Sequence, residues 1–323
     1  MKVLVTGAGG FVGRALCEEL LRRGIHVTAA VRAPNEFSSA TETAAVGAID
    51  GATDWTGPLH GVDVVIHLAA RVHVVKDKAA DPLAEFLKVN LHGTENLARQ
   101  AVRAGVKRLV YASTVKVNGE RTSDAGSFSE SDPPDPHDPY GMSKWQAEQA
   151  LQRVADETGL EVGVVRPPLV YGPGVKGNFH SLLDVLDKGV PLPLAGARNL
   201  RSLVYVGNLA DALIVCATHP AAAGQIYLVS DGEDVSTAQL VARISAALGR
   251  KNRSYYAPPV LLRAAAMVLG RTEQVDRLFG SLRVNDEKIR RELGWVPPWS
   301  MARGLRATVD SYRMQRNGYN RGS

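Results

Sequence analysis

Residues 3–16 read VLVTGAGGFVGRAL, and this stretch decides the fold. An apolar run of strand length passes through a glycine-rich turn into the helix-like RALCEELLRRG. Glycines at 7, 10 and 13 let the backbone turn tightly, let a pyrophosphate approach the helix N-terminus, and let helix and strand pack closely. The spacing differs from the commoner G-x-G-x-x-G, and a tight turn alone could explain it. The candidate phosphate-binding residues are Gly7, Gly10, Phe11, Val12 and Gly13.

Further short apolar runs follow at residues 26–31, 62–68, 107–113 and 161–166, separated by helix-like segments. Near-continuous apolar strands that alternate with helices are typical of a parallel sheet covered on both faces. We therefore predict an α/β fold with a Rossmann-type doubly wound parallel sheet. On the first strand, turn and helix of such a chain, the glycine triplet predicts dinucleotide binding.

The chain has 323 residues, more than one hydrophobic core usually holds. After RPPLVYGPG at 166–174 the pattern changes: glycine and prolines interrupt residues 175–202, and helices at 236–249 and 285–295 have weaker strand partners. We expect an NAD(P)-binding Rossmann domain at 1–174. Residues 175–323 are expected to form mainly a smaller C-terminal substrate-binding lobe, with some segments returning to the main sheet.

Charge and composition narrow the function classes. Lys and Arg number 38 against 33 acids, and the net +5 is spread along the chain, so nucleic acid is not indicated. This bias suits an anionic substrate, although an ordinary surface explains it equally well. Cys17 and Cys216 are expected to be small core residues of a protein from a reducing compartment. No metal site is expected among the eight His.

No membrane association is expected from the sequence. The chain starts directly on a strand, without the pattern of a signal peptide. The apolar segment at 258–270 is too short to span a bilayer and is interrupted by Arg263. We therefore expect a cytoplasmic protein.

The end of the second strand bears on the cofactor. An acidic residue near this point binds the ribose 2′-hydroxyl of NAD, whereas a positive charge accommodates a 2′-phosphate. Here Val31 is followed by Arg32. The sequence therefore favours NADP slightly over NAD, although a surface arginine after a strand is common.

Several motifs together resemble one family. They are TGAGGFVG at 6–13, DVVIHLAA at 63–70, VNLHGTENL at 89–97, YASTVKVNGE at 111–120 with PYGMSK at 139–144, and RPPLVYGPG at 166–174. Their order and separations resemble those of the extended short-chain dehydrogenases/reductases. The nucleotide-sugar 4-epimerases, dehydratases and 4-keto reductases are the most similar group. The resemblance implies an enzyme that binds NAD or NADP and a nucleotide sugar.

Tyr140 and Lys144 lie four residues apart, on one face of a predicted helix. The resemblance implies that Tyr140 exchanges a proton with a sugar oxygen while hydride passes to or from the nicotinamide. A free phenol has a pKa of about 10, and a nearby ammonium with the oxidised nicotinamide would lower it. Lys144 would also bind the cofactor ribose.

A third group is expected to hydrogen-bond the same sugar oxygen, from the carboxyl end of the strand at 107–113, where open α/β sheets bind ligands. The family motif aligns Thr114 with the catalytic position and Ser113 with a supporting, substrate-contacting one. Ser and Thr also often end strands before turns, which is the simpler explanation.

The resemblance implies further ligand contacts. Asp50 and Gly51, at the end of the third strand, match the adenine site, although an Asp-Gly turn predicts the same residues. The remaining cofactor candidates are Leu68, Ala69 and Ala70 against the dinucleotide, Asn90 as a brace of the central strands, and Pro167 and Val170 near the nicotinamide. The candidates for the nucleotide diphosphate are Asn178 and Arg201, followed by Arg277 and Arg283, each of which could be a solvated helix charge.

Departures from the family pattern suggest the reaction. Sugar 4,6-dehydratases place an Asp-Glu pair where this chain has Val115 and Lys116, so dehydration is disfavoured. The missing acidic NAD ligand favours a 4-keto reductase. The STVKVNGE stretch at 113–120 resembles that of bacterial reductases and epimerases that act on UDP-linked N-acetylated sugars for surface polysaccharides. A 4-epimerase with retained NAD is the alternative. A non-catalytic sensor is disfavoured because the tyrosine, lysine and threonine are all kept. The resemblance also implies a homodimer, because the helices at 81–105 and 143–159 correspond to those that pair between subunits in relatives, although each could instead pack against the core alone.

Overall fold

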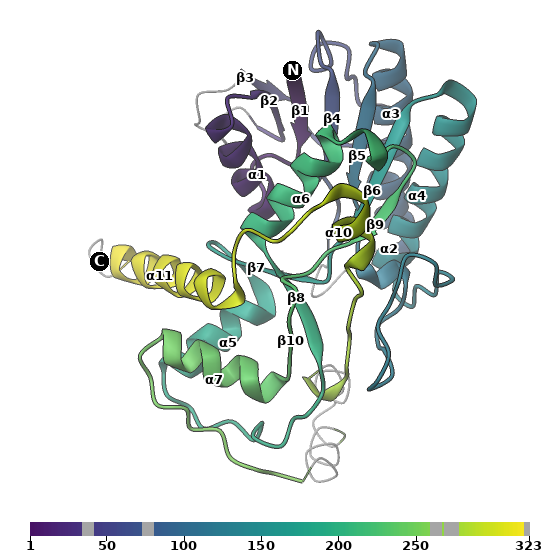
Figure 1. Cartoon of the computed structure of the whole chain (residues 1–323). Coiled ribbons are helices and arrows are strands. Elements are labelled where there is room, and N and C mark those ends of the chain that lie inside the picture. Colours follow the sequence, from purple (N-terminus) through teal and green to yellow (C-terminus); the bar gives the residue numbers. More distant parts are fainter. Residues whose placement is uncertain (34–41, 73–80, 259–266, 268–277, 320–323) are drawn as a thin grey trace.

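The computed structural model describes residues 1–33, 42–72, 81–258, 267 and 278–319. Its main sheet is parallel, with the strand order β3-β2-β1-β4-β5-β6-β9 (Figure 1). The strands are β1 Lys2–Thr6, β2 His26–Val31, β3 Glu42–Ala45, β4 Val64–His67, β5 Arg108–Ala112, β6 Glu161–Arg166 and β9 Ile226–Leu228. The order reverses beside β1, as in dinucleotide-binding folds. The predicted doubly wound Rossmann-type sheet is confirmed.

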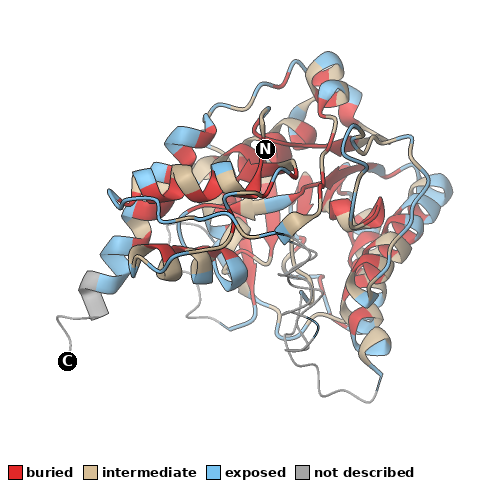
Figure 2. Ribbon diagram, turned by 90° about the horizontal axis from the view of Figure 1, so that it is seen from below, coloured by how far each residue is buried: buried red, intermediate tan, exposed pale blue. Residues whose placement is uncertain are grey.

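Helices cover both faces of this sheet. On one face, α1 (Phe11–Arg22) and α6 (Val206–Thr218) bury Leu16, Leu20 and Leu213 against the strands. On the other, α3 (Thr94–Arg103) and α4 (Pro139–Thr158) bury Leu97 and Leu151. Figure 2 shows the buried residues concentrated in the strands and on the helix faces turned toward them. These two apolar layers fix the positions at which α1 and α4 begin.

A smaller lobe surrounds a second sheet of order β10-β8-β7. Its strands are β7 Leu169–Tyr171, β8 Arg201–Tyr205 and β10 Asp234–Val235, and its helices are α5 Gly177–Asp187, α7 Thr237–Ala247 and α11 Met301–Tyr319. The lobe sheet therefore begins at Leu169, shortly before the predicted boundary at 174. In the second half of the chain, α6, β9 and α10 (Glu287–Leu293) pack with the main sheet.

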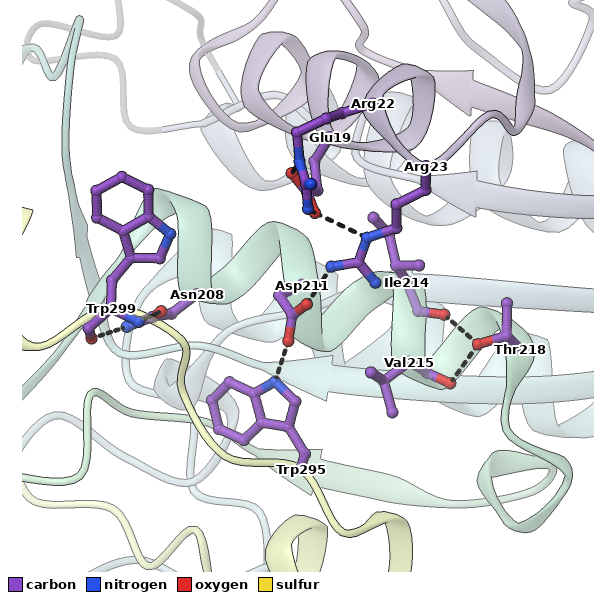
Figure 3. A network of polar contacts seen from close by, with 10 residues as sticks. All are labelled: Glu19, Arg22, Arg23, Asn208, Asp211, Ile214, Val215, Thr218, Trp295 and Trp299. Carbon is purple, nitrogen blue, oxygen red and sulfur yellow. Dashed lines mark hydrogen bonds and ion pairs between the residues drawn. The ribbon is translucent and has the colours of Figure 1, made fainter.

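Polar contacts tie α1 and α6 to the C-terminal segment (Figure 3). Arg23 at the end of α1 pairs with Glu19, at 2.7 Å, and with Asp211 of α6. The indole nitrogen of Trp295 donates to Asp211 at 2.8 Å. The side-chain amide of Asn208 donates to the backbone carbonyl of Trp299 and accepts from its N–H. Residues far apart in sequence thus hold these two helices in register.

The third strand departs from the prediction, because it ends at Ala45 rather than at Asp50. Its sequence, ETAA, lies at the edge of the sheet and is mostly exposed, so no apolar run marks it. Asp50 instead lies in a turn, where its carboxylate accepts from the backbone N–H of Ala52 at 2.8 Å. The Asp-Gly turn, which also predicted these residues, explains Asp50.

The segment predicted as a single helix at 81–105 is divided. It runs as α2 (Pro82–Leu87), a π-helical segment (Lys88–Gly93) and α3. Single π-helical turns within helices are frequent at functional sites. This one carries Asn90, which is buried. Short 3₁₀ helices complete the element order at Val115–Val117 and Pro220–Ala222.

Both cysteines are buried in helices, Cys17 in α1 and Cys216 in α6, as predicted. Burial raises the pKa of each thiol to about 12. In the part of the chain that the structure describes, no group of side chains could hold a metal ion. Nor is any described helix long and apolar enough to cross a membrane. Most of the apolar segment at 258–270 lies outside the described residues.

Candidate active site

The glycine turn between β1 and α1 leaves no room for side chains. Gly7 has φ +68°, and a Cβ there would lie 2.9 Å from the backbone nitrogen of Ala69. A Cβ on Gly13 would lie 2.2 Å from the carbonyl oxygen of Gly7. Gly10 caps α1 without a side-chain hydrogen bond. The N–H groups at the start of α1 are therefore presented without a covering side chain, which fits a dinucleotide pyrophosphate.

A cleft of about 1670 Å³ opens beside this turn. It brings together ten of the predicted residues, which are Gly10, Phe11, Val12, Leu68, Ala70, Ser113, Tyr140, Lys144, Pro167 and Val170. Gly7, Gly13 and Ala69 lie behind its wall in the close contacts described above. The start of α1, the ends of β4 and β5, and the start of α4 thus converge on one cavity. This is the edge of the sheet where such folds bind ligands.

The start of α4 is set by its cap. Asp138 accepts a hydrogen bond from the backbone N–H of Gly141 at 2.6 Å, and Pro139 occupies the first helical position, which suits a residue without an N–H. Tyr140 and Lys144 consequently lie one turn apart on the side of α4 that faces the cleft.

Lys144 is only 1% exposed. Its ammonium donates to the carbonyl oxygen of Ala112 at 2.6 Å and lies 3.9 Å from the centre of the Tyr111 ring. Burial lowers the pKa of Lys144 to about 7, against the opposing influence of Glu148 one turn further along α4. The lysine is therefore held at the end of β5, below the cleft.

The pKa of Tyr140 departs from the expectation. Burial, and secondarily the carboxylate of Asp138, raise the pKa of the phenol above its usual range. Removal from water disfavours the charged phenolate. The ammonium of Lys144 is directed to a carbonyl oxygen and to an aromatic ring. The phenol is thus protonated at neutral pH and can donate a proton.

The two hydroxyls after β5 have different surroundings. Ser113 lines the cleft, and its hydroxyl donates to the buried carboxylate of Glu148. Thr114 is 8% exposed, and its hydroxyl accepts from the backbone N–H of Lys116 at 3.3 Å. Thr114 is not among the residues that line the cavity. Its catalytic role stays a prediction.

A buried ion pair beneath these hydroxyls escaped the sequence analysis. Arg166, at the end of β6, binds both carboxylate oxygens of Glu148, at 3.0 and 2.5 Å. Arg166 also donates to the amide oxygen of Asn118 at 3.1 Å. Glu148 lies two turns after Tyr140 on the same face of α4, and this spacing is the signal that could have revealed it. The pair positions Ser113, because the Glu148 carboxylate accepts the hydrogen bond from the Ser113 hydroxyl.

His67 also went unnoticed, because it ends an apolar strand. The hydroxyl of Thr6 accepts from the N–H groups of Leu68 and Ala69 and therefore donates to Nδ1 of His67, at 2.6 Å. Nε2 then donates to the hydroxyl of Thr94 at 2.9 Å. Burial, and then Lys144, lower the pKa of His67 to about 3, so the ring is neutral. This chain of bonds positions the strand end that lines the cleft.

Asn90 braces the segment after β4. Its side chain exchanges hydrogen bonds with the backbone N–H and carbonyl of Arg71, at 2.8 and 3.0 Å. Its amide also donates to the hydroxyl of Ser143 on α4, at 2.9 Å. Asn90 therefore acts on the cleft through the backbone and α4, and does not line it.

The predicted nucleotide-binding residues lie apart from this cavity. Arg201, on β8, donates to the carbonyl of Gly280 at 3.3 Å, and Arg283 pairs with Asp234 at 2.6 Å. Asn178 is exposed in the first turn of α5. Arg277 lies outside the described residues. Arg32 is exposed directly after β2, and with Asp50 and Gly51 it does not line the cavity.

Comparison with known proteins agrees with this arrangement. The profile of the NAD dependent epimerase/dehydratase family matches residues 3–230. A UDP-glucose 4-epimerase of Vibrio cholerae is 42% identical over 318 residues, which cover 98% of this chain and 96% of that protein. The chain belongs to the NAD-dependent epimerase/dehydratase family. The resemblance noted in the sequence is confirmed.

Solved structures that are similar to this chain match it over nearly its full length. MoeE5 in complex with UDP-glucose and NAD is 27% identical, with a TM-score of 0.77, and the match covers 98% of this chain and 100% of that one. A Thermus thermophilus UDP-glucose 4-epimerase in complex with NAD is 26% identical, with a TM-score of 0.75 and coverages of 97% and 99%. The chain is thus an enzyme of the NAD-dependent, nucleotide-sugar epimerase/dehydratase type.

Proposed function

We propose that this protein is an NAD-dependent 4-epimerase of a UDP-linked sugar. The observation that supports this reading most is the 42% identity with the Vibrio cholerae UDP-glucose 4-epimerase over nearly the full length of both chains. The open start of α1 in the cleft of Tyr140 and Lys144 is consistent with it, because hydride transfer needs cofactor and proton carrier together. The MoeE5 and Thermus complexes favour NAD as the cofactor.

In this proposal Tyr140 carries the proton. It removes the proton from the C4 hydroxyl when the alcohol is oxidised and returns it when the ketone is reduced on its other face. Bound NAD would supply the hydride acceptor and donor. Lys144 stabilises the phenolate form, and Ser113 with Thr114 orients the sugar oxygen. Arg201 and Asn178 are proposed to hold the nucleotide diphosphate.

A 4-keto reductase is the second candidate. The raised pKa of Tyr140 keeps its proton in place, which suits a group that donates to a ketone oxygen. Arg32 follows β2 where a committed NAD enzyme usually has an acidic residue, so NADP also stays a prediction. Such an enzyme consumes a reduced cofactor at every turnover, whereas an epimerase recycles it.

This difference gives the test. The purified protein is analysed for bound nucleotide and is then offered UDP-glucose, UDP-N-acetylglucosamine and a UDP-4-keto sugar, each with and without added NADH or NADPH. Interconversion of two 4-epimers without added cofactor is the expected result. Stoichiometric loss of NADH or NADPH with the 4-keto sugar alone would replace the epimerase proposal with the reductase.

The predicted homodimer and cytoplasmic location belong to the same proposal. The helices α3 and α4 lie side by side on one face of the sheet, where the family pairs such helices between subunits (Figure 1). Sedimentation at several protein concentrations tests the dimer, and a monomer at all of them would exclude it.

A further inference from the structure

Lys116 connects the two segments that carry the candidate catalytic hydroxyls. Its backbone N–H donates to the hydroxyl of Thr114, at 3.3 Å. Its ammonium forms an ion pair with the carboxylate of Asp138 and lies 3.4 Å from Glu120. Twenty-two residues of chain separate Lys116 from Asp138, so the pair closes the long loop at 118–139.

Asp138 is the residue through which this pair reaches Tyr140. The Asp138 carboxylate caps α4 by accepting from the Gly141 N–H at 2.6 Å. It precedes Tyr140 by two residues, and after burial, which is the larger cause, its charge raises the pKa of the phenol further. The carboxylate therefore aligns the start of α4 but also disfavours the phenolate that proton removal requires.

The other titratable groups around the phenol come from three elements. On α4, Lys144 lies one turn further along, and on β5, Tyr111 interacts electrostatically with Tyr140. The Phe86 ring of α2 packs against the Tyr140 ring, with 6.1 Å between the ring centres. The Arg71 guanidinium lies 5.5 Å from the centre of the Phe86 ring. Lys116 is a cation that forms an ion pair with Asp138.

We propose that Lys116 is a positioning residue that holds the start of α4 against the Thr114 turn and offsets the charge of Asp138 beside Tyr140. This inference rests on the proposed role of Tyr140 and assigns a function to a residue that the proposed mechanism does not use. The pair is only partly exposed, at 29% for the Lys116 side chain and 18% for that of Asp138, so solvent screens it incompletely.

The expected size of the effect follows from the electrostatics of nearby charges. A carboxylate that loses a paired cation in a partly buried setting shifts the pKa of a neighbouring group by about one unit, or about 1.4 kcal/mol. Loss of Lys116 should raise the pKa of Tyr140 by about this amount. Loss of the Asp138 charge should lower it.

Four variants separate charge from position. Lys116→Met removes the cation, and Lys116→Arg restores it. Asp138→Asn removes the anion but keeps an oxygen that can cap α4. The double variant Lys116→Met/Asp138→Asn removes both charges. Lys2→Met is the matched control, because Lys2 forms an ion pair with Glu42 at 2.7 Å and its side chain is similarly exposed, at 27%.

Two readouts report on Tyr140. The tyrosinate absorbance of NAD-saturated protein is measured as a function of pH. The curve of the matching variant that also carries Tyr140→Phe is subtracted from the curve of each variant, so that the difference reports Tyr140. The midpoint should rise by about one pH unit in Lys116→Met, fall in Asp138→Asn, and stay near that of the unaltered protein in Lys116→Arg, the double variant and Lys2→Met. The pH dependence of kcat/KM, measured on the substrate that the protein turns over, should shift in the same directions.

An unchanged midpoint in Lys116→Met would overturn the inference. So would a loss of cooperative unfolding in Lys116→Met but not in Lys2→Met, because it would mark a role in folding alone. Full turnover by Tyr140→Phe would instead refute the proposed mechanism. The absorbance titration decides the effect of the ion pair independently of turnover.

Discussion

At the residue scale, the pKa values of Tyr140 and Lys144 both depart from their ordinary values, in opposite directions. Burial raises the pKa of the phenol and lowers that of the amine to about 7, so the neutral form of each group is favoured. A proton carrier of this kind works when a ligand supplies the compensating charge. The site is therefore expected to become active as a base only when cofactor and substrate are both in place.

Replacing the phenol hydroxyl tests this role directly. Tyr140→Phe is expected to lower kcat by at least about a hundredfold, because proton transfer by a positioned side chain contributes that much or more. NAD binding, measured by titration calorimetry, should persist. Tyr255→Phe, at an exposed tyrosine, is the control and should behave normally. Normal kcat in Tyr140→Phe would contradict the assignment.

His67 gives a prediction on acid stability. Its pKa is about 3 in the folded protein and about 6.5 when unfolded, so the unfolded chain binds more protons between these values. Its contribution to the free energy of unfolding should fall by about 1.4 kcal/mol per pH unit as the pH drops below about 6.5. Urea unfolding from pH 7 to 5 measures this slope, and His67→Gln should flatten it. An equal slope in the variant would assign the acid sensitivity to other groups.

At the scale of elements, the sequence predicted the strands and helices whose patterns are local. The strands β1, β2, β4, β5 and β6 are apolar runs, and each was found close to its predicted range. The edge strand β3 ends earlier than predicted, because its exposed side chains leave no apolar signature that would mark its range. The spacing from Tyr140 could have placed Glu148 on the same face of α4, but not its pairing with Arg166, which joins α4 to β6 through tertiary packing.

The turn between β1 and α1 should tolerate no added methyl group at its third glycine. Gly13→Ala would place a Cβ 2.2 Å from the Gly7 carbonyl, which must shift the backbone that faces the cofactor. NAD affinity is expected to fall by at least about tenfold, which corresponds to about 1.4 kcal/mol. Gly57→Ala is the control, since its Cβ would meet no atom within 4 Å. Calorimetric titration of both variants with NAD decides the point.

At the scale of the whole molecule, the long loop at 118–139 joins the two lobes. The backbone of Phe128 exchanges hydrogen bonds of 2.8 Å with Arg283 and Asn285, and the Phe128 ring packs on a small core that contains Val115 and Leu282. The turn after β5 is thereby linked to the segment that carries Arg283. The sequence does not reveal the partner that this loop contacts, because the two segments lie far apart in the chain.

This link predicts a shared effect on both lobes. Phe128→Ala is expected to destabilise the protein by about 3 kcal/mol, the lower range for removing a buried phenyl group, because the ring is only partly buried. It should also raise the KM for the nucleotide sugar more than the Kd for NAD. Urea unfolding and steady-state kinetics test this, and a rise in the NAD Kd alone would contradict it.

The main chain passes between the two lobes repeatedly, since β7 leaves the main sheet, α6 and β9 rejoin it, β10 leaves again and α10 returns. Neither lobe can therefore be expressed, exchanged or deleted as one continuous piece of the gene. A fragment of residues 1–174 would lack α6 and β9, exposing one face of the sheet and the edge of β6 to self-association. Evolution of substrate preference in such a protein is confined to changes within segments, because the two lobes must fold as one unit.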